Sequence, residues 1–305
     1  ATPHPMHAEW AIKAAEAGKH LLVEKPIGIN AAEAMAIIQA AADNDVFCME
    51  AYMYRCSPQT ARLVELVRGG AIGEVRVIRA AFSFHAGFNP EARLFNNALA
   101  GGGILDVGGY CTSMARLIAG AAQGKDFVDP IEVKGCGRLG ATGVDEWAVA
   151  AMKFPGEILA YVSTGISVNQ DNCVQIFGTL GNILVPWPWI PAREGGQLKF
   201  QLKLNKEPSA QEIVVETDQW LYGLEADSVA ENIERRQSPA MSWDDTLGNI
   251  RAMDAWRASF GLVYIAEQPE NVQPVARRPV RWSVGGAKAA TSRPQMKYGR
   301  LPGID

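Results

Sequence analysis

The stretch LLVEKPIGINAAEAMAIIQAAADNDVFCM, residues 21–49, decides the fold class of the first part of this chain. Its two ends, LLVE and VFCM, are short apolar runs with the length of buried strands. Between them, Asn30 followed by Glu33 is a helix N-cap signal, so the alanine-rich run 31–42 is predicted to be a helix. A strand, a helix and a second strand in this order predict parallel strands joined by a crossover helix.

The same alternation continues outward in both directions. Residues 6–17 have the apolar periodicity of a helix, and a glycine follows as a stop. After the second strand, Ser57 and the proline behind it begin a helix that stops at Gly69-Gly70. These residues therefore predict a parallel sheet flanked by helices.

From about residue 74 the pattern changes to long strands joined by tight turns. EVRVIRAAFSF at 74–84 is the first predicted strand. Further strands, separated by residues typical of hairpin turns, continue to about residue 216. Long neighbouring strands of this kind predict an open antiparallel sheet. Two helices follow, at roughly 222–236 and 243–266. The predicted fold class is α/β followed by α+β: a partial parallel sheet, then a large open antiparallel sheet with flanking helices.

The composition narrows the function before any motif is considered. The 305 residues are 48% hydrophobic and 20% charged, which is typical of a globular protein and argues against a disordered, collagen-like or membrane-spanning chain. The formal net charge of -4, with no run of Lys and Arg, argues against a nucleic-acid-binding surface. Five scattered cysteines without a CxxC pair suit a reducing, cytoplasmic location better than disulfides or a zinc ribbon.

The segment GCGRLG at 135–140 matches the GxGxxG pattern of dinucleotide-binding loops. That pattern binds phosphate because a helix begins directly after the third glycine. The residues that follow here, ATGVDEWAVAAMKF, alternate like a strand instead. We therefore interpret the match as a strand with a glycine bulge rather than as a cofactor site.

The stretch GGGILDVGGYCTSMARLIAG, residues 101–120, carries the first candidate site. Asp106 and Tyr110 are four residues apart, so on a helix both side chains project from one face. Gly108 and Gly109 between them each cost a helix interior up to about 1 kcal/mol relative to Ala. Glycine at these positions suggests that something approaches the backbone closely. The alternative is a frayed helix start with a buried tyrosine.

Lys25 carries the second signal, because it follows a predicted parallel strand at the end where open α/β sheets bind their ligands. A single lysine after a strand is more often a solvated surface charge. Together with Asp106 and Tyr110, however, it suggests redox chemistry. Hydride transfer at a carbonyl or alcohol needs a proton donor or acceptor, and tyrosine can serve where a nearby cation lowers its pKa.

Four segments occur in the order found in one known family: Glu24-Lys25-Pro26, EAYMYRCSPQ at 50–59, GGAIGEVRVIRAAFSF at 69–84 and GGGILDVGGY at 101–110. With them the chain resembles the Gfo/Idh/MocA oxidoreductases, over residues 1 to about 282. The resemblance is strongest to the branch that contains glucose–fructose oxidoreductase, NADP-dependent D-xylose dehydrogenase and dimeric dihydrodiol dehydrogenase.

The resemblance implies roles for individual residues. Lys25 would contact the substrate and the nicotinamide ribose, Asp106 would orient the substrate, and Tyr110 would be the general acid/base. Many relatives have histidine at the last position, and the tyrosine points to the sugar and diol branch. Arg93 is a weaker candidate for substrate contact. The implied cofactor is NADP or NAD, and the residues expected to contact it are Thr2, Pro3, His4 (where an asparagine is common), His7, Glu24, Lys25 and Pro26, the last with a cis peptide bond.

The resemblance also implies a domain organisation. Residues 1–73 would be the C-terminal part of a Rossmann dinucleotide-binding domain, and residues 74–282 a substrate-binding and dimerisation domain with the helix 101–120 at the active site. In the family a glycine-rich phosphate loop precedes the segment that begins here, so we expect the chain as written to bind dinucleotide poorly on its own. Residues 283–305 have linker composition. They end in MKYGRLPGID, which resembles the opening strand of an aldo-keto reductase or forms only a tail.

Two further sets of residues have alternative interpretations. His4 and His7 are close enough in sequence to bind a metal, but without further His or Cys at ligand spacing we expect no metal. Trp187 and Trp189 could cover the face of a sugar, or could be packing residues or part of a subunit contact.

The predicted function is hydride transfer between a nicotinamide cofactor and a sugar, polyol or trans-diol. An NAD-dependent glycosidase of the same fold is one alternative, and a non-catalytic oligomerisation module of a fused enzyme is another. We expect a small-molecule carbohydrate or diol substrate, no nucleic-acid or membrane partner, and a homo-oligomer formed through the antiparallel sheet. The exact substrate is not predicted.

Overall fold

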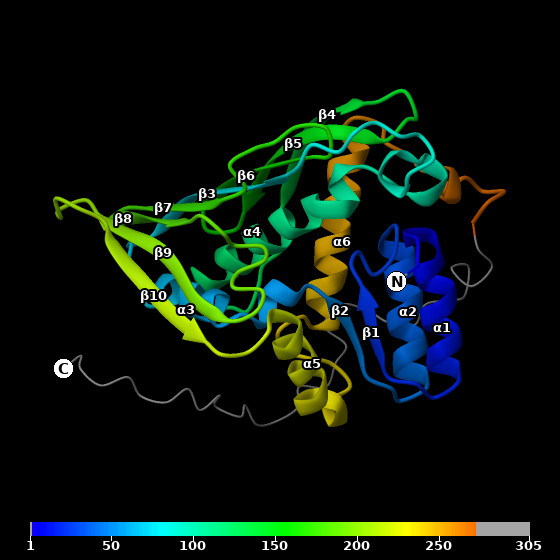
Figure 1. Cartoon of the computed structure of the whole chain (residues 1–305), viewed down its shortest axis with the longest axis horizontal. Helices are drawn as coiled ribbons and strands as arrows, with labels where there is room; N and C mark the ends of the chain where they lie inside the picture. The colour runs from blue at the N-terminus through cyan, green and yellow to red at the C-terminus, as the bar shows by residue number, and fades with distance from the viewer. Residues whose placement is uncertain (1, 273–305) are drawn as a thin grey trace.

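The computed structural model describes residues 2–272 (Figure 1). The predicted linker and tail at 283–305 lie outside the described residues. No helix in the described part combines the length and apolar composition needed to cross a bilayer.

The N-terminal part contains the predicted parallel strands. β1 (Leu21–Glu24) pairs in parallel with β2 (Cys48–Ala51), and α2 (Ala31–Asp43) connects them. A short 3-10 helix (His4–Met6) leads into α1 (His7–Glu16), which packs against α2 on the same side of the strands (Figure 1). The cap of α2 is as predicted, because the Asn30 side chain accepts the backbone N–H of Glu33 at 3.1 Å. The Glu33 carboxylate accepts the N–H of Ile29.

The chain then crosses to a second, larger sheet. After β2 come a 3-10 helix, η2 (Met53–Cys56), and α3 (Pro58–Arg68), which is capped by the Ser57 hydroxyl. Eight strands follow in the spatial order β10-β9-β8-β7-β3-β6-β5-β4. Their bounds are β3 (Val75–Ser83), β4 (Glu132–Leu139), β5 (Asp145–Phe154), β6 (Ile158–Gly165), β7 (Val174–Gly178), β8 (Gly181–Val185), β9 (Gly196–Leu204) and β10 (Gln211–Thr217).

The expectation of an antiparallel sheet is wrong for one pair of strands. β3 and β6 are parallel, with Ile78 opposite Ala160, whereas the other neighbouring pairs are antiparallel. The reason lies in the connection. After β3 the chain passes through α4 (Gly109–Ala121) to the far edge of the sheet, and β4, β5 and β6 then return towards β3. A long crossover of this kind allows parallel pairing, which a hairpin does not.

Within residues 2–272, helices cover one face of the large sheet and leave the other open (Figure 1). α4 packs on β3 and β6, α6 (Trp243–Ala258) packs on β4, and α3 packs on β10. α6 ends eight residues before the predicted residue 266, because the chain turns at Gly261, whose φ of 76° is left-handed. α5 (Leu221–Asn232) continues as a 3-10 turn (Ile233–Arg235). The domain boundary at residue 73 stays a prediction.

Residues 135–139 belong to β4, as expected, Gly140 follows the strand, and β5 rather than a helix comes next. The predicted glycine bulge is wrong, because Gly135 and Gly137 pair regularly with Ala150 and Ala148. The register shifts only between Arg138 and Leu139, where the extra residue, Glu146, belongs to β5. Gly135 faces the Trp256 ring and Gly137 faces the Phe260 ring so closely that a Cβ at either position would collide. The glycines therefore let α6 and the turn after it pack on β4.

Candidate active site

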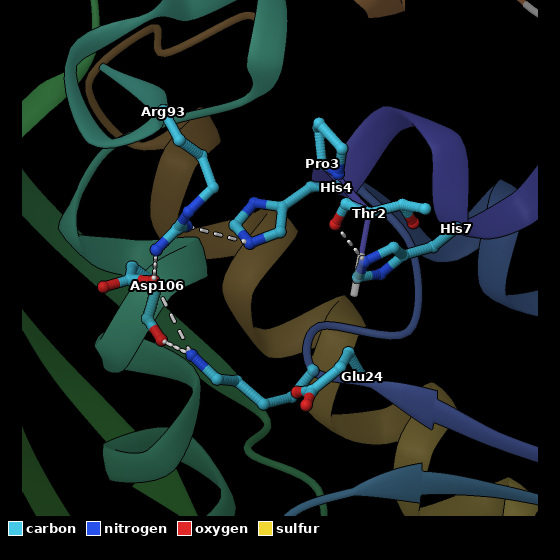
Figure 2. Close-up of a pocket in the computed structure, with 8 residues that line it drawn as sticks. Thr2, Pro3, His4, His7, Glu24, Arg93 and Asp106 are labelled. Atoms are coloured by element: carbon cyan, nitrogen blue, oxygen red, sulfur yellow. Dashed lines mark hydrogen bonds and ion pairs between the residues drawn. The ribbon is translucent and has the colours of Figure 1, made fainter.

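A pocket of about 300 Å³ opens at the carboxyl end of β1 (Figure 2). Thr2, His7 and Glu24 approach it from the N-terminal part, while Arg93 and Asp106 approach it from the segments that precede α4 (Figure 2). The pocket therefore brings together residues that are far apart in the sequence. All of its lining residues were predicted as site residues: Thr2, Pro3, His4, His7, Glu24, Lys25, Arg93 and Asp106.

Lys25, Asp106 and Arg93 form an ion-pair cluster in this pocket. Lys25 Nζ donates to the backbone oxygen of Asp106 at 2.5 Å and lies 3.6 Å from its carboxylate. Arg93 Nη2 donates to the same carboxylate at 2.9 Å (Figure 2). Burial alone would raise the pKa of Asp106, but the charges of Lys25 and then Arg93 hold it below its usual value. Asp106 is therefore ionised and fixes both cations.

Asp106 lies in a π-helical turn (Ile104–Gly108) that leads directly into α4. Such turns are frequent at functional sites because they displace side chains from regular helical positions. The turn is anchored at its start by Asp145, whose buried carboxylate accepts the N–H of Ile104 at 2.7 Å. The sequence correctly indicated a close approach to the glycines, since Gly108 packs against Trp256 and Gly109 against Met253.

Tyr110 lies behind the pocket rather than in its wall. Its hydroxyl donates to Met53 Sδ at 3.3 Å, and only 3% of the residue is exposed. Lys25 Nζ lies 5.4 Å from the centre of the Tyr110 ring. The ring also contacts four other aromatic side chains, those of Tyr52, Tyr54, Phe82 and Trp189.

The pKa of Tyr110 is raised well above its usual value, in contrast to the expected lowering by a cation. Burial is the largest cause, and Tyr222, Glu24, Asp106 and Glu225 add to it. Although Lys25 Nζ lies near the ring, burial of the phenol prevails. Tyr110 is therefore a neutral phenol, which can donate a proton.

His4 and His7 contact backbone carbonyls. His4 Nδ1 lies 3.0 Å from the oxygen of Ala100, and its Nε2 lies 3.4 Å from Arg93 Nη1. Burial lowers the pKa of His4 to about 4, so the ring is neutral and its Nδ1–H donates. His7 Nδ1 lies 2.8 Å from the oxygen of Pro26, and its Nε2 lies 3.0 Å from that of Thr2.

These contacts hold the Thr2–Pro3 segment against the loop that carries Lys25. The Lys25–Pro26 peptide bond is cis, as expected. Among residues 2–272, no group of His, Cys, Asp and Glu is arranged to bind a metal ion.

Three residues at the site received no role from the sequence. Met53 meets the Tyr110 hydroxyl, Asp145 caps the π turn, and Glu50 Oε1 accepts the N–H of Ile27 at 2.9 Å. Glu50 is 1% exposed and burial raises its pKa to about 7. An acidic residue directly after the apolar run VFCM was the one available signal for it.

The two tryptophans lie in different environments. Trp189 is buried and stacks on Phe82 with the ring centres 5.5 Å apart, and its Nε1–H donates to the oxygen of Ala81. It is therefore a packing residue, although it lies 5.9 Å from the Tyr110 ring. Trp187 is 74% exposed.

Two family models match the chain. The model described as oxidoreductase family, NAD-binding Rossmann fold, matches residues 1–52, and the GFO/IDH/MocA C-terminal domain matches residues 60–184. Trans-1,2-dihydrobenzene-1,2-diol dehydrogenase of Mus musculus is 36% identical over 191 residues, which are 63% of this chain and 55% of that protein. The chain thus spans about half the length of this relative.

Two longer matches agree with the family models. The trans-1,2-dihydrobenzene-1,2-diol dehydrogenase of Xenopus laevis is 30% identical over 271 residues, or 86% of this chain and 77% of that protein. Among solved structures, aldose-aldose oxidoreductase from Caulobacter crescentus, in complex with glycerol, has a TM-score of 0.74 and 26% identity, covering 85% of this chain and 75% of that one.

Proposed function

Because this chain belongs to the Gfo/Idh/MocA oxidoreductase family, we propose that it transfers hydride between NADP or NAD and a CH–OH carbon of a sugar, polyol or trans-diol. The observation that carries this proposal is the position of Lys25, which contacts Asp106 in the pocket and lies over the Tyr110 ring. The names of the dihydrodiol and aldose relatives support the substrate class.

The pocket residues fit a nicotinamide nucleotide. Thr2, Glu24 and Lys25 offer a hydroxyl, a carboxylate and an ammonium group at the end of β1, and this donor set suits the hydroxyls of a ribose. These residues, together with Pro3, His4, His7 and Pro26, would hold the nicotinamide half of the cofactor. When bound, the cofactor supplies or accepts hydride at the nicotinamide ring.

The remaining chemistry falls to four side chains. The Lys25 ammonium stabilises negative charge on the substrate oxygen as the carbonyl is reduced. Asp106 keeps Lys25 in place and, with Arg93, orients the substrate. When substrate binds, the Tyr110 hydroxyl forms its hydrogen bond with the substrate oxygen instead of with Met53 Sδ. Tyr110 then donates its proton to this oxygen during reduction and takes it back during oxidation.

Steady-state assays of the purified protein, with the cofactor concentration raised until the rate saturates because weak dinucleotide binding is expected, test this function. With NADP or NAD, a panel of aldoses, polyols and trans-diols should include substrates that change the cofactor absorbance at a rate proportional to enzyme. A cofactor that binds while no member of the panel is oxidised or reduced would refute the proposal. Nitrophenyl glycosides serve as the control for the glycosidase alternative, and we expect no release of nitrophenol from them.

We further propose a homodimer formed through the open face of the large sheet. Trp147 and Val149 on β5, with Leu159 and Tyr161 on β6, are between 44% and 51% exposed on this face. β5 and β6 are neighbours, so the four side chains form one apolar patch. A cytoplasmic location is proposed because the five cysteines, all in the described part, are free thiols.

A further inference from the structure

The π turn that carries Asp106 has a glycine at its N-cap, Gly103, so it has no capping side chain of its own. A Cβ added at Gly103 would lie only 3.1 Å from the Cα of Gly165 in β6, which leaves little room for a larger residue. The start of a helical turn nevertheless leaves backbone N–H groups that need an acceptor. The acceptor for this turn therefore has to come from another part of the chain.

Asp145, the first residue of β5, supplies that acceptor. Its side chain is buried, and its Oδ2 accepts the N–H of Ile104 at 2.7 Å. Gly102, whose φ is 107°, allows this close approach, since a Cβ there would collide with the Asp145 carboxylate. The glycines before the π turn therefore make room for a carboxylate that belongs to another strand.

β6 holds the same segment at a second point. The hydroxyl of Thr164, a fully buried residue, donates to the oxygen of Gly103 at 3.0 Å. The N–H of Gly102 donates to the oxygen of Leu94 at 2.8 Å, directly after Arg93. The two side chains of the ion pair that this arginine forms in the pocket therefore both extend from backbone that is anchored on the large sheet (Figure 2).

The position of the π turn matters for the Lys25 ammonium group. Two residues beyond Ile104, the backbone oxygen of Asp106 accepts a hydrogen bond from Lys25 Nζ at 2.5 Å. A side chain can compensate for a small shift by changing its rotamer, whereas a backbone oxygen moves with its turn. A displacement of the π turn would therefore displace the ammonium group as well.

We propose that Asp145 is a positioning residue of the active site. By holding the N–H of Ile104 it fixes the backbone oxygen of Asp106, and this oxygen holds the Lys25 ammonium where the reaction needs it. The inference rests on the proposed function, in which Lys25 stabilises charge on the substrate oxygen. Asp145 is not among the residues that line the pocket, so it acts through the turn and not on the substrate.

Asp145→Ala tests this role by removing the acceptor of the Ile104 N–H. With the best sugar or diol substrate of the unaltered protein, kcat should fall by about 10²-fold, the loss expected when a catalytic group is displaced by about 1 Å. Asp145→Asn keeps an acceptor oxygen and should restore most of kcat. Ser242→Ala is the matched control, because it removes the acceptor of the Asp245 N–H at the start of α6. It should lower the melting temperature without lowering kcat.

A double variant separates positioning from a general structural role. Lys25→Met already lacks the group that Asp145 positions, so adding Asp145→Ala should lower its kcat by less than about threefold, because groups that act as a unit are not additive. A purely structural effect would multiply the two losses. If Asp145→Ala does not fold, Thr164→Val replaces it, because it removes the second bond to the turn and keeps the side-chain shape. It should lower kcat about fivefold in the unaltered protein, as for one neutral hydrogen bond, and not at all in Lys25→Met.

The outcomes distinguish the two proposals. An unaltered kcat in the folded variant, or a loss in Lys25→Met as large as in the unaltered protein, would overturn the role of Asp145 and leave the proposed function in place. Absence of cofactor-dependent turnover of every sugar and diol by the unaltered protein would overturn the proposed function, and the inference with it.

Discussion

Lys25 and Asp106 are 81 residues apart in the chain, yet Lys25 Nζ lies 2.5 Å from the backbone oxygen of Asp106. The contact joins the end of β1 to the π turn that leads into α4. It places an ammonium group between the Asp106 carboxylate and the Tyr110 ring.

Replacing Lys25 with methionine should lower kcat by about 10²- to 10³-fold, the range found when a group that stabilises developing charge is removed. Lys19→Met, at an exposed position just before β1, is the matched control and should retain full activity. Steady-state kinetics with a sugar or diol substrate measure both variants. Full activity in Lys25→Met would remove the lysine from the mechanism.

Tyr110→Phe should lower kcat by ~10²- to 10⁴-fold, because the proton donor is lost while the buried ring remains. The fold should persist, since the hydroxyl donates only to a thioether sulfur, a weak acceptor. Tyr161→Phe removes a hydroxyl from a tyrosine that is 48% exposed on the outer sheet face. It should leave kcat unaltered, and circular dichroism should show the same helix content in all three proteins.

Glu50 makes the stability depend on pH. Burial raises its pKa from 4.5 to about 7, so the unfolded state ionises first as the pH rises. The contribution of Glu50 to the free energy of unfolding is fully present below pH 4.5 and is lost as the pH rises through 7. At about 1.4 kcal/mol per pH unit, this loss amounts to about 3 kcal/mol.

Glu50→Gln should therefore gain stability relative to the unaltered protein between pH 4.5 and pH 8. Its amide oxygen still accepts the N–H of Ile27, and its side chain does not ionise. Chemical denaturation at several pH values measures the difference, with Glu65→Gln as an exposed control. If the difference in free energy of unfolding between Glu50→Gln and the unaltered protein does not change with pH, the raised pKa of Glu50 is contradicted.

Gly135→Ala tests whether the GxGxxG segment is structural. The added Cβ would collide with the Trp256 ring, and overpacking of this kind costs about 1–3 kcal/mol. The melting temperature should fall while the affinity for NADP or NAD stays the same. Gly87→Ala, where nothing lies within 4 Å of the added carbon, should change neither quantity. Weaker cofactor binding at unchanged stability would instead indicate a cofactor site.

Trp147→Glu should convert the proposed dimer to a monomer, because it places a charge in the apolar patch on the open sheet face. Sedimentation velocity measures the mass in solution. Val263→Glu adds the same charge at a residue that is 59% exposed outside this sheet, and it should leave the dimer intact. An unaltered mass in Trp147→Glu would place the subunit contact elsewhere.

The elements of the fold could be predicted because their signals are local. The Asn30 cap, the Ser57 cap and the alternation in β5 depend on residues a few positions apart, and the structure confirms all three. The end of α6 at Ala258 and the parallel pairing of β3 with β6 were missed. The first depends on a left-handed glycine, and the second on a connection that spans the whole sheet.

The sequence by itself indicated the residues that line the pocket, through motifs around Lys25 and Asp106 that resemble those of a known family, although Tyr110 and Pro26, expected at the same site, are not part of the lining. Only the tertiary structure decided what those residues do to one another. Tyr110 is a neutral phenol because four rings and η2 exclude water from it. Asp145 accepts the N–H of Ile104 at the start of the π turn from a strand 41 residues further along the chain, which no pattern in the sequence indicates. Desolvation and ion pairing depend on which surfaces pack together, and local sequence does not encode that.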